Sequence, residues 1–119
     1  SHTCVVARTT AELMAVREKL EALGLATSVI EPSEVDSRRD GAIKMATIHR
    51  VKGLEFDQLI LASANEGLVP LAVAMAGKAD KISAQEAETE ERSLVYVAIT
   101  RARKQAYVLS YSIMSKFFR

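Results

Sequence analysis

Apolar residues near the amino terminus occur first in a short run and then at helical spacing. Residues 3–8 are rich in Val and bounded by polar residues, which predicts a buried strand. A helix should follow, because Thr9 and Glu12 match a capping box and Gly24 suits a helix end. Its predicted apolar face consists of Leu13, Val16, Leu20 and Leu23. A β-prone run at residues 25–30 completes a strand–helix–strand unit, so we expect neighbouring parallel strands and a right-handed crossover.

The rest of the chain predicts three more strands and one long helix. The strands are expected at residues 43–48, 58–63 and 106–111. The helix is expected at residues 86–104, with acidic residues at its start and basic residues at its end, as the helix dipole favours. A polar stretch at residues 31–41 indicates an exposed connection, and residues 112–119 indicate a short helix or a tail. The predicted fold class is α/β, a three-layer sandwich with a mostly parallel sheet.

Composition narrows the class of protein. A length of 119 residues fits one domain, and 49% hydrophobic with 26% charged residues is typical of a globular chain. The net charge of +1 excludes a polybasic, histone-like binder but allows a local basic strip. Cys4 is the single cysteine, so no internal disulfide is possible, and no metal site is expected. We see no membrane span or signal peptide, and the start at Ser1 suggests a piece of something larger.

The loop after the third predicted strand carries the first candidate chemistry. In open parallel sheets, functional residues lie beyond the carboxyl ends of the strands. Thr47, His49 and Lys52 could hold phosphate oxygens. Gly53 would let the backbone approach a ligand closely, and Glu55 could accept a hydrogen bond from a sugar hydroxyl. The alternative is a solvated turn without a ligand.

A second candidate is Arg101, at the end of the long predicted helix. Its charge could complement the helix dipole, or its guanidinium could reach a phosphoryl group carried by a neighbouring domain. The dipeptide Gly77–Lys78 is not part of a phosphate-binding P-loop. That motif needs GxxxxGK[ST], and here Ala72 and Ala79 occupy the first glycine and the hydroxyl positions.

Four segments, which occur in the same order as in the family, resemble parts of UvrD/Rep-type superfamily 1 DNA helicases. Residues 5–10 (VVARTT) are similar to the start of their second RecA-like domain. Residues 47–56 (TIHRVKGLEF) resemble motif V, and residues 91–103 (ERSLVYVAITRAR) resemble motif VI. Residues 66–70 (EGLVP) resemble the E-G-x-x-P element between them. The chain is thus identified as resembling the C-terminal, second RecA-like domain, with residues 1–119 as one such domain.

The resemblance implies an ATP-binding role for three residues. Arg101 matches the arginine finger, which reaches the γ-phosphate of ATP bound on the first RecA-like domain. A charged donor fork at that place stabilises the charge that develops on the transferred phosphoryl group. Glu55, with Gly53 before it, matches the carboxylate that contacts the nucleotide sugar. Mg²⁺ and the ATP phosphates would be held mainly by the first RecA-like domain, which this chain does not contain.

The resemblance also implies contacts with single-stranded DNA. Thr47 and His49 match residues that touch DNA or couple that contact to the nucleotide site. Arg8 and Thr10 lie where the family holds the DNA backbone, at a helix start suited to phosphate. We expect the basic residues on one working edge, namely Arg8, Lys52, Arg101 and Arg103.

The chain departs from the family pattern at three places. Thr10 stands where the family usually has Asn, and Leu71 stands where many members have His after E-G-x-x-P. Only residues 31–42 occupy the place of the accessory domain that large members insert before motif V.

The expected function is that of the C-terminal motor domain of a cytoplasmic, ATP-dependent DNA helicase or translocase. Its partners would be single-stranded DNA and the first RecA-like domain of the same chain, with no membrane. Alternatives are a catalytically degenerate RecA-like module with an interaction or regulatory role, and a nuclease-helicase or repair-complex subunit. The isolated fragment should be inactive, because it lacks a P-loop.

Overall fold

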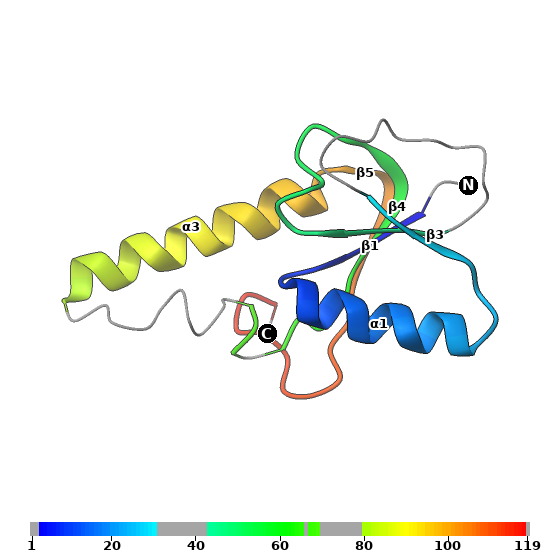
Figure 1. Cartoon of the computed structure of the whole chain (residues 1–119). Helices are drawn as coiled ribbons and strands as arrows, with labels where there is room; N and C mark the ends of the chain where they lie inside the picture. Colours follow the sequence, from blue (N-terminus) through cyan, green and yellow to red (C-terminus); the bar gives the residue numbers. More distant parts are fainter. Residues whose placement is uncertain (1–2, 31–42, 66, 70–79, 119) are drawn as a thin grey trace.

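The computed structural model describes residues 3–30, 43–65, 67–69 and 80–118 (Figure 1). These residues form a parallel sheet with a helix on each face. In chain order the elements are β1 (Thr3–Ala7), α1 (Thr10–Ala22), β2 (Thr27–Val29), β3 (Ile43–Thr47), β4 (Phe56–Leu61), α3 (Lys81–Ile99) and β5 (Ala102–Val108). The predictions for residues 31–42 and 70–79, including Leu71 and Gly77–Lys78, lie outside the described residues.

The sheet has the strand order β2-β3-β1-β4-β5, with every pairing parallel. The predicted neighbours β1 and β2 are separated by β3, so that expectation is wrong. The reason is burial: β3 is buried over its three central residues, whereas all three residues of β2 are half-exposed. An apolar strand gains most at the centre of a parallel sheet, where helices cover both faces. The short β2 therefore takes the edge.

Alternating side chains of the strands form two cores, one on each face of the sheet. The core under α1 contains Val5, Ala7 and Met45 of the strands and Leu13 of the helix. The core under α3 contains Val6, Ala46, Phe56, Leu59 and Leu61 of the strands with Val95 and Ala98 of the helix. Two cores with one sheet between them confirm the predicted three-layer α/β sandwich.

The start of α1 follows the prediction in part. The Thr9 hydroxyl accepts a hydrogen bond from the Glu12 N–H at 3.2 Å, as a capping box requires. The Glu12 carboxylate, however, accepts from the Tyr111 hydroxyl at 3.2 Å. At the other end Leu23 is 76% exposed, so its predicted place on the buried face is wrong. The helix has already ended at that residue, and Gly24 follows with the expected positive φ of 86°.

The long helix α3 begins and ends earlier than the predicted residues 86–104. Asp80 caps its start, because the Asp80 carboxylate accepts from the Ser83 N–H at 2.7 Å. Its end is set by sheet pairing, since the Phe56 N–H donates to the Arg101 carbonyl at 2.9 Å and draws the chain into β5. The first turn therefore has no acidic residue and the last turn no basic one, so the expected match to the helix dipole is wrong. The strand predicted at residues 106–111 begins at Ala102.

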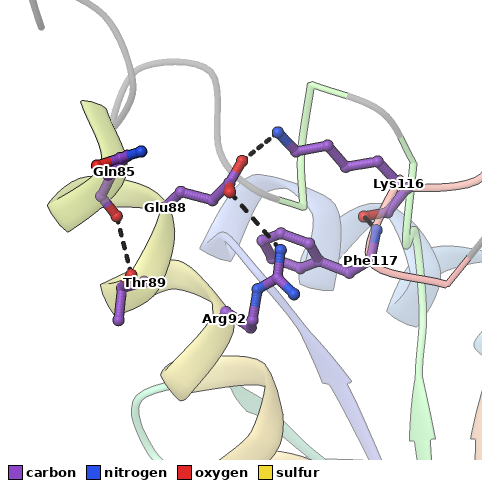
Figure 2. Close-up of polar contacts among 7 residues, drawn as sticks. Gln85, Glu88, Thr89, Arg92, Lys116 and Phe117 are labelled. Carbon is purple, nitrogen blue, oxygen red and sulfur yellow. Dashed lines mark hydrogen bonds and ion pairs between the residues drawn. The ribbon is translucent and has the colours of Figure 1, made fainter. Parts of the chain in front are cut away.

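The chain after β5 folds back against α3. The described residues 111–118 contain no helix, and Met114 forms a bridge with Asn65. Figure 2 shows the contact with α3: Lys116 pairs with Glu88, and the Arg92 guanidinium lies 4.7 Å from the centre of the Phe117 ring. The hydrogen bond from Lys116 lowers the pKa of Glu88. The tail and the helix thus support each other where α3 extends beyond the sheet (Figure 1).

Candidate functional site

Two adjacent strands bring the predicted DNA-binding residues to the carboxyl edge of the sheet. β1 and β3 pair in parallel with Ala7 opposite Thr47, and the Ile48 N–H donates to the Ala7 carbonyl at 2.9 Å. Arg8 and His49 follow these strand ends. The Arg8 Nη1 lies 3.4 Å from the His49 Nε2. Thr10 is exposed in the first turn of α1, just beyond the same edge.

The Arg8 guanidinium is held by a residue that was not predicted to belong to the site. Its Nε donates to the Glu91 Oε1 at 3.0 Å, and its Nη2 donates to the Glu91 Oε2 at 2.8 Å. Only 12% of the Arg8 side chain and 6% of the Glu91 side chain are exposed. Glu91 lies within the segment that resembles motif VI. Helical spacing could have found it, because Glu91 shares a face of α3 with the small or apolar residues Ala87, Val95 and Ala98. An acidic residue on such a face stands out.

A hollow of about 650 Å³ opens beside this ion pair, between the loop after β3 and α3. Its lining combines the basic residues Arg8, His49 and Lys52 with the acidic residues Glu90 and Glu91, and its apolar part consists of Ile48, Leu94 and Val97. Such a mixture of charged groups and apolar surface is typical of a ligand-binding hollow.

The loop after β3 carries the chain to the opposite edge of the sheet. Val51 is fully buried and anchors the loop, and the Leu54 N–H donates to the Val51 carbonyl at 3.0 Å. Gly53 has a φ of +84°, which an L side chain rarely adopts, and no atom lies within 4 Å of where a Cβ would be. The backbone at this turn is therefore open to a ligand, and Glu55 follows it with an exposed side chain.

Glu55 and Arg101 lie side by side at the amino edge of the sheet. Phe56, directly after Glu55, donates its N–H to the Arg101 carbonyl. The Arg101 N–H donates to the Ala98 carbonyl at 3.1 Å, which fixes the backbone of Arg101 to the end of α3. The Arg101 Nε is buried and has no acceptor among the described residues. A buried, charged donor without an acceptor is costly, so this group suits an incoming anion.

The structure therefore separates residues that we expected on one edge. Arg8 follows the end of β1, whereas Arg101 and Arg103 lie at the start of β5, and β1, β4 and β5 are parallel. The start of one strand and the end of another lie on opposite edges of a parallel sheet. Arg103 is moreover paired with Asp57 at 2.9 Å. The expectation that all candidate groups follow carboxyl ends of strands is wrong for Glu55 and Arg101.

The described part of the chain offers little to a metal ion. No group of three or more His, Cys, Asp or Glu side chains among these residues could hold one. Within the same residues no helix is long and apolar enough to cross a membrane. Arg101, Glu55 and the open turn at Gly53 together offer a charged donor, a hydrogen-bond acceptor and accessible backbone.

The chain is similar in sequence to curated DNA helicases. It is 41% identical over 69 residues to the ATP-dependent DNA helicase PcrA of Leuconostoc citreum, covering 58% of this chain and 8% of that protein. It is 32% identical over 90 residues to PcrA of Bacillus subtilis, covering 76% of this chain and 11% of that protein. The chain thus spans about a tenth of the length of these relatives.

The fold also has a solved counterpart. The C-terminal domain of a possible DNA helicase from Lactobacillus plantarum superposes with a TM-score of 0.68 and 21% sequence identity, over 96% of this chain and 58% of that one. At this level of identity the likeness concerns the fold, and it agrees with a RecA-like arrangement. Residues 2–113 match the family model of the UvrD-like helicase C-terminal domain, and the chain therefore belongs to that family.

Proposed function

We propose that this chain is the C-terminal motor domain of an ATP-dependent DNA helicase or translocase. In this role residues 1–119 are one RecA-like domain of a longer protein, and Arg101 is its arginine finger. The observation that carries the proposal is the buried Arg101 Nε without an acceptor, beside the exposed Glu55 at one edge of the sheet.

The amino edge of the sheet would face ATP held on the first RecA-like domain. ATP with Mg²⁺ supplies the phosphoryl group whose transfer to water drives the motor. Arg101 would place its planar donor fork at the γ-phosphate and stabilise the charge that develops there. Glu55 would accept a hydrogen bond from the nucleotide sugar, and Gly53 would let the backbone approach it. The backbone bonds of Arg101 to Ala98 and Phe56 keep this group in place before ATP arrives.

The carboxyl edge would carry single-stranded DNA. Arg8 and His49 supply cationic or titratable donors, and Thr10 and Thr47 supply hydroxyls. The N-terminus of α1 also favours a phosphate at the same place. Contacts of this kind hold the DNA backbone without reading its sequence, and they weaken with salt.

The two edges together suit a motor. ATP would close the cleft between two RecA-like domains and hydrolysis would reopen it, while the grip on DNA alternates. The loop from Thr47 to Glu55 and the helix α3 both run from the DNA edge to the ATP edge. Translocation in the 3′→5′ direction is what the family resemblance implies.

The test is Arg101→Ala in the full-length protein, with ATP turnover measured in the presence of single-stranded DNA. We expect turnover to fall by about 10³–10⁵-fold, the range for arginine fingers. DNA affinity should stay unchanged, since Arg101 lies at the other edge. Arg103→Ala is the matched control, because Arg103 is two residues away and paired with Asp57. Undiminished turnover in Arg101→Ala would favour the alternative of a degenerate module with an interaction or regulatory role.

A further inference from the structure

Glu91 is a charged residue on a face of α3 that otherwise buries small or apolar side chains, namely Ala87, Val95 and Ala98. Its carboxylate binds Arg8 side-on through two hydrogen bonds of 3.0 and 2.8 Å. Taking two charges out of water is costly even when they are paired, and apolar side chains in place of both Arg8 and Glu91 could fill the same space without that cost. The carboxylate at this position therefore indicates a role other than stabilising the domain.

The ion pair joins three separate elements at one guanidinium. Arg8 follows β1, Glu91 belongs to α3, and the Arg8 Nη1 lies 3.4 Å from the His49 Nε2 in the loop after β3. Because a bidentate pair fixes both distance and orientation, it restrains α3 in its position along the sheet and in its rotation. A single hydrogen bond would leave that rotation free.

The same helix carries Arg101 at its other end. From Glu91 to Ile99 the helix is uninterrupted, a length of about 12 Å at 1.5 Å per residue. The Arg101 N–H bonds back to Ala98 in the last turn at 3.1 Å. A shift of α3 at Glu91 is therefore transmitted to Arg101, because a continuous helix moves as a rigid rod.

We infer that Glu91 is a positioning residue, which holds α3 through Arg8 and thereby sets the place of Arg101. This inference rests on the proposed function. A DNA phosphate that reaches Arg8 competes with the Glu91 carboxylate for the same donor fork. The presence of DNA at the carboxyl edge thus changes the restraint on α3, and so links DNA binding to the position of Arg101 at the amino edge.

The experiment is Glu91→Gln in the full-length protein, which keeps the side-chain size and one acceptor oxygen but removes the charge. We expect the DNA-stimulated kcat to fall by up to about 10²-fold, the loss that a 1 Å misplacement of a catalytic group causes. The KM for ATP should stay unchanged, because Arg101 acts on the transition state. Glu88→Gln is the matched control: it removes an ion pair from the same helix, but the partners of Glu88 are Lys116 and Arg92 (Figure 2).

A double-mutant cycle with Arg101→Lys separates positioning from a general effect. If Glu91 acts through Arg101, Glu91→Gln causes no further loss of kcat once Arg101 is Lys. Independent, multiplicative losses overturn the inference, as does full activity of Glu91→Gln. Loss of cooperative thermal unfolding in Glu91→Gln also overturns it, since the carboxylate would then serve stability.

The outcomes also distinguish the two proposals. If the wild-type protein shows no DNA-stimulated ATP turnover, or if Arg101→Ala retains it, the proposed function and the inference both fail. If Arg101→Ala is inactive while Glu91→Gln is fully active, only the role of Glu91 is lost.

Discussion

Gly53 and Arg101 are held by their backbone conformation, whereas Arg8 at the other edge of the sheet is held by the side chain of Glu91. Gly53 has a φ of +84° with open space around it, and Arg101 is fixed by hydrogen bonds of its own N–H and carbonyl. Such positions depend on backbone conformation, so a substitution acts through strain or through lost chemistry. The two effects can be measured separately.

Gly53→Ala tests the strain. An L side chain at this φ costs about 1–2 kcal/mol, and no steric clash adds to it because the space is open. We expect the free energy of unfolding, measured by urea denaturation, to fall by about that amount. Lys52→Ala, at the exposed neighbouring position, should leave it nearly unchanged. Equal unfolding energies for both variants would show that the turn relaxes without strain.

At the scale of elements, α3 passes Arg8 at the carboxyl edge of the sheet, ends near the start of β5 at the amino edge, and is anchored at several points along its length. The pair Arg8–Glu91 holds its middle, Lys116 pairs with Glu88 one turn earlier, and Phe117 packs against Arg92 (Figure 2). Its first turn depends on the side chain of Asp80, which accepts from both the N–H and the hydroxyl of Ser83. These bonds to the ionised carboxylate, the first from the Ser83 N–H, lower the pKa of Asp80 below its ordinary value of 3.8.

The Asp80 cap predicts a local pH dependence. Because the pKa is lower in the folded chain, the stabilisation is present above the unfolded value of 3.8 and is lost as the pH falls through the folded value. We expect the Ser83 amide to lose protection from hydrogen exchange only in this acidic range, as followed by NMR. Asp80→Asn should keep the cap without this titration, since Asn caps helices equally well. An identical acid transition in Asp80→Asn would assign the effect to another group.

At the scale of the whole molecule, the residues that we propose to face the nucleotide, Glu55 and Arg101, lie at one edge of the sheet. The sequence contains no GxxxxGK[ST], and the described residues contain no cluster that could hold a metal ion. An arginine finger accelerates phosphoryl transfer only where another group holds the phosphates and Mg²⁺.

The isolated 119-residue chain should therefore hydrolyse no ATP, whereas the full-length protein should do so when single-stranded DNA is added. Phosphate release from both proteins, at equal concentration and with the same DNA, tests this. Arg101→Ala of the full-length protein serves as the inactive reference. DNA-stimulated turnover by the isolated chain, above that reference, would contradict the division of the site between two domains.

Local pattern was enough to predict the type of the described strands and helices, although not all of their bounds. Alternation and run length predicted all five described strands, although the starts of β4 and β5 were placed too late. The cap at Thr9 and the turn at Gly24 bound α1 as expected. The start of α3 was predicted too late because the helix cap at Asp80 was not recognised in the sequence. Parallel pairing of β1 and β3 brings Arg8 beside His49.

The sequence by itself determined the element types, the parallel α/β class and the resemblance that led to Arg101 and Glu55, because these depend on short-range spacing. Only the tertiary structure decided that β3 separates β1 from β2, that Arg8 and Arg101 lie on opposite edges, and that Glu91 holds Arg8. The pair Arg8–Glu91 joins residues 83 positions apart. Such contacts depend on which surfaces are buried against each other. Because all segments of the chain compete for burial at once, short-range spacing does not determine the outcome.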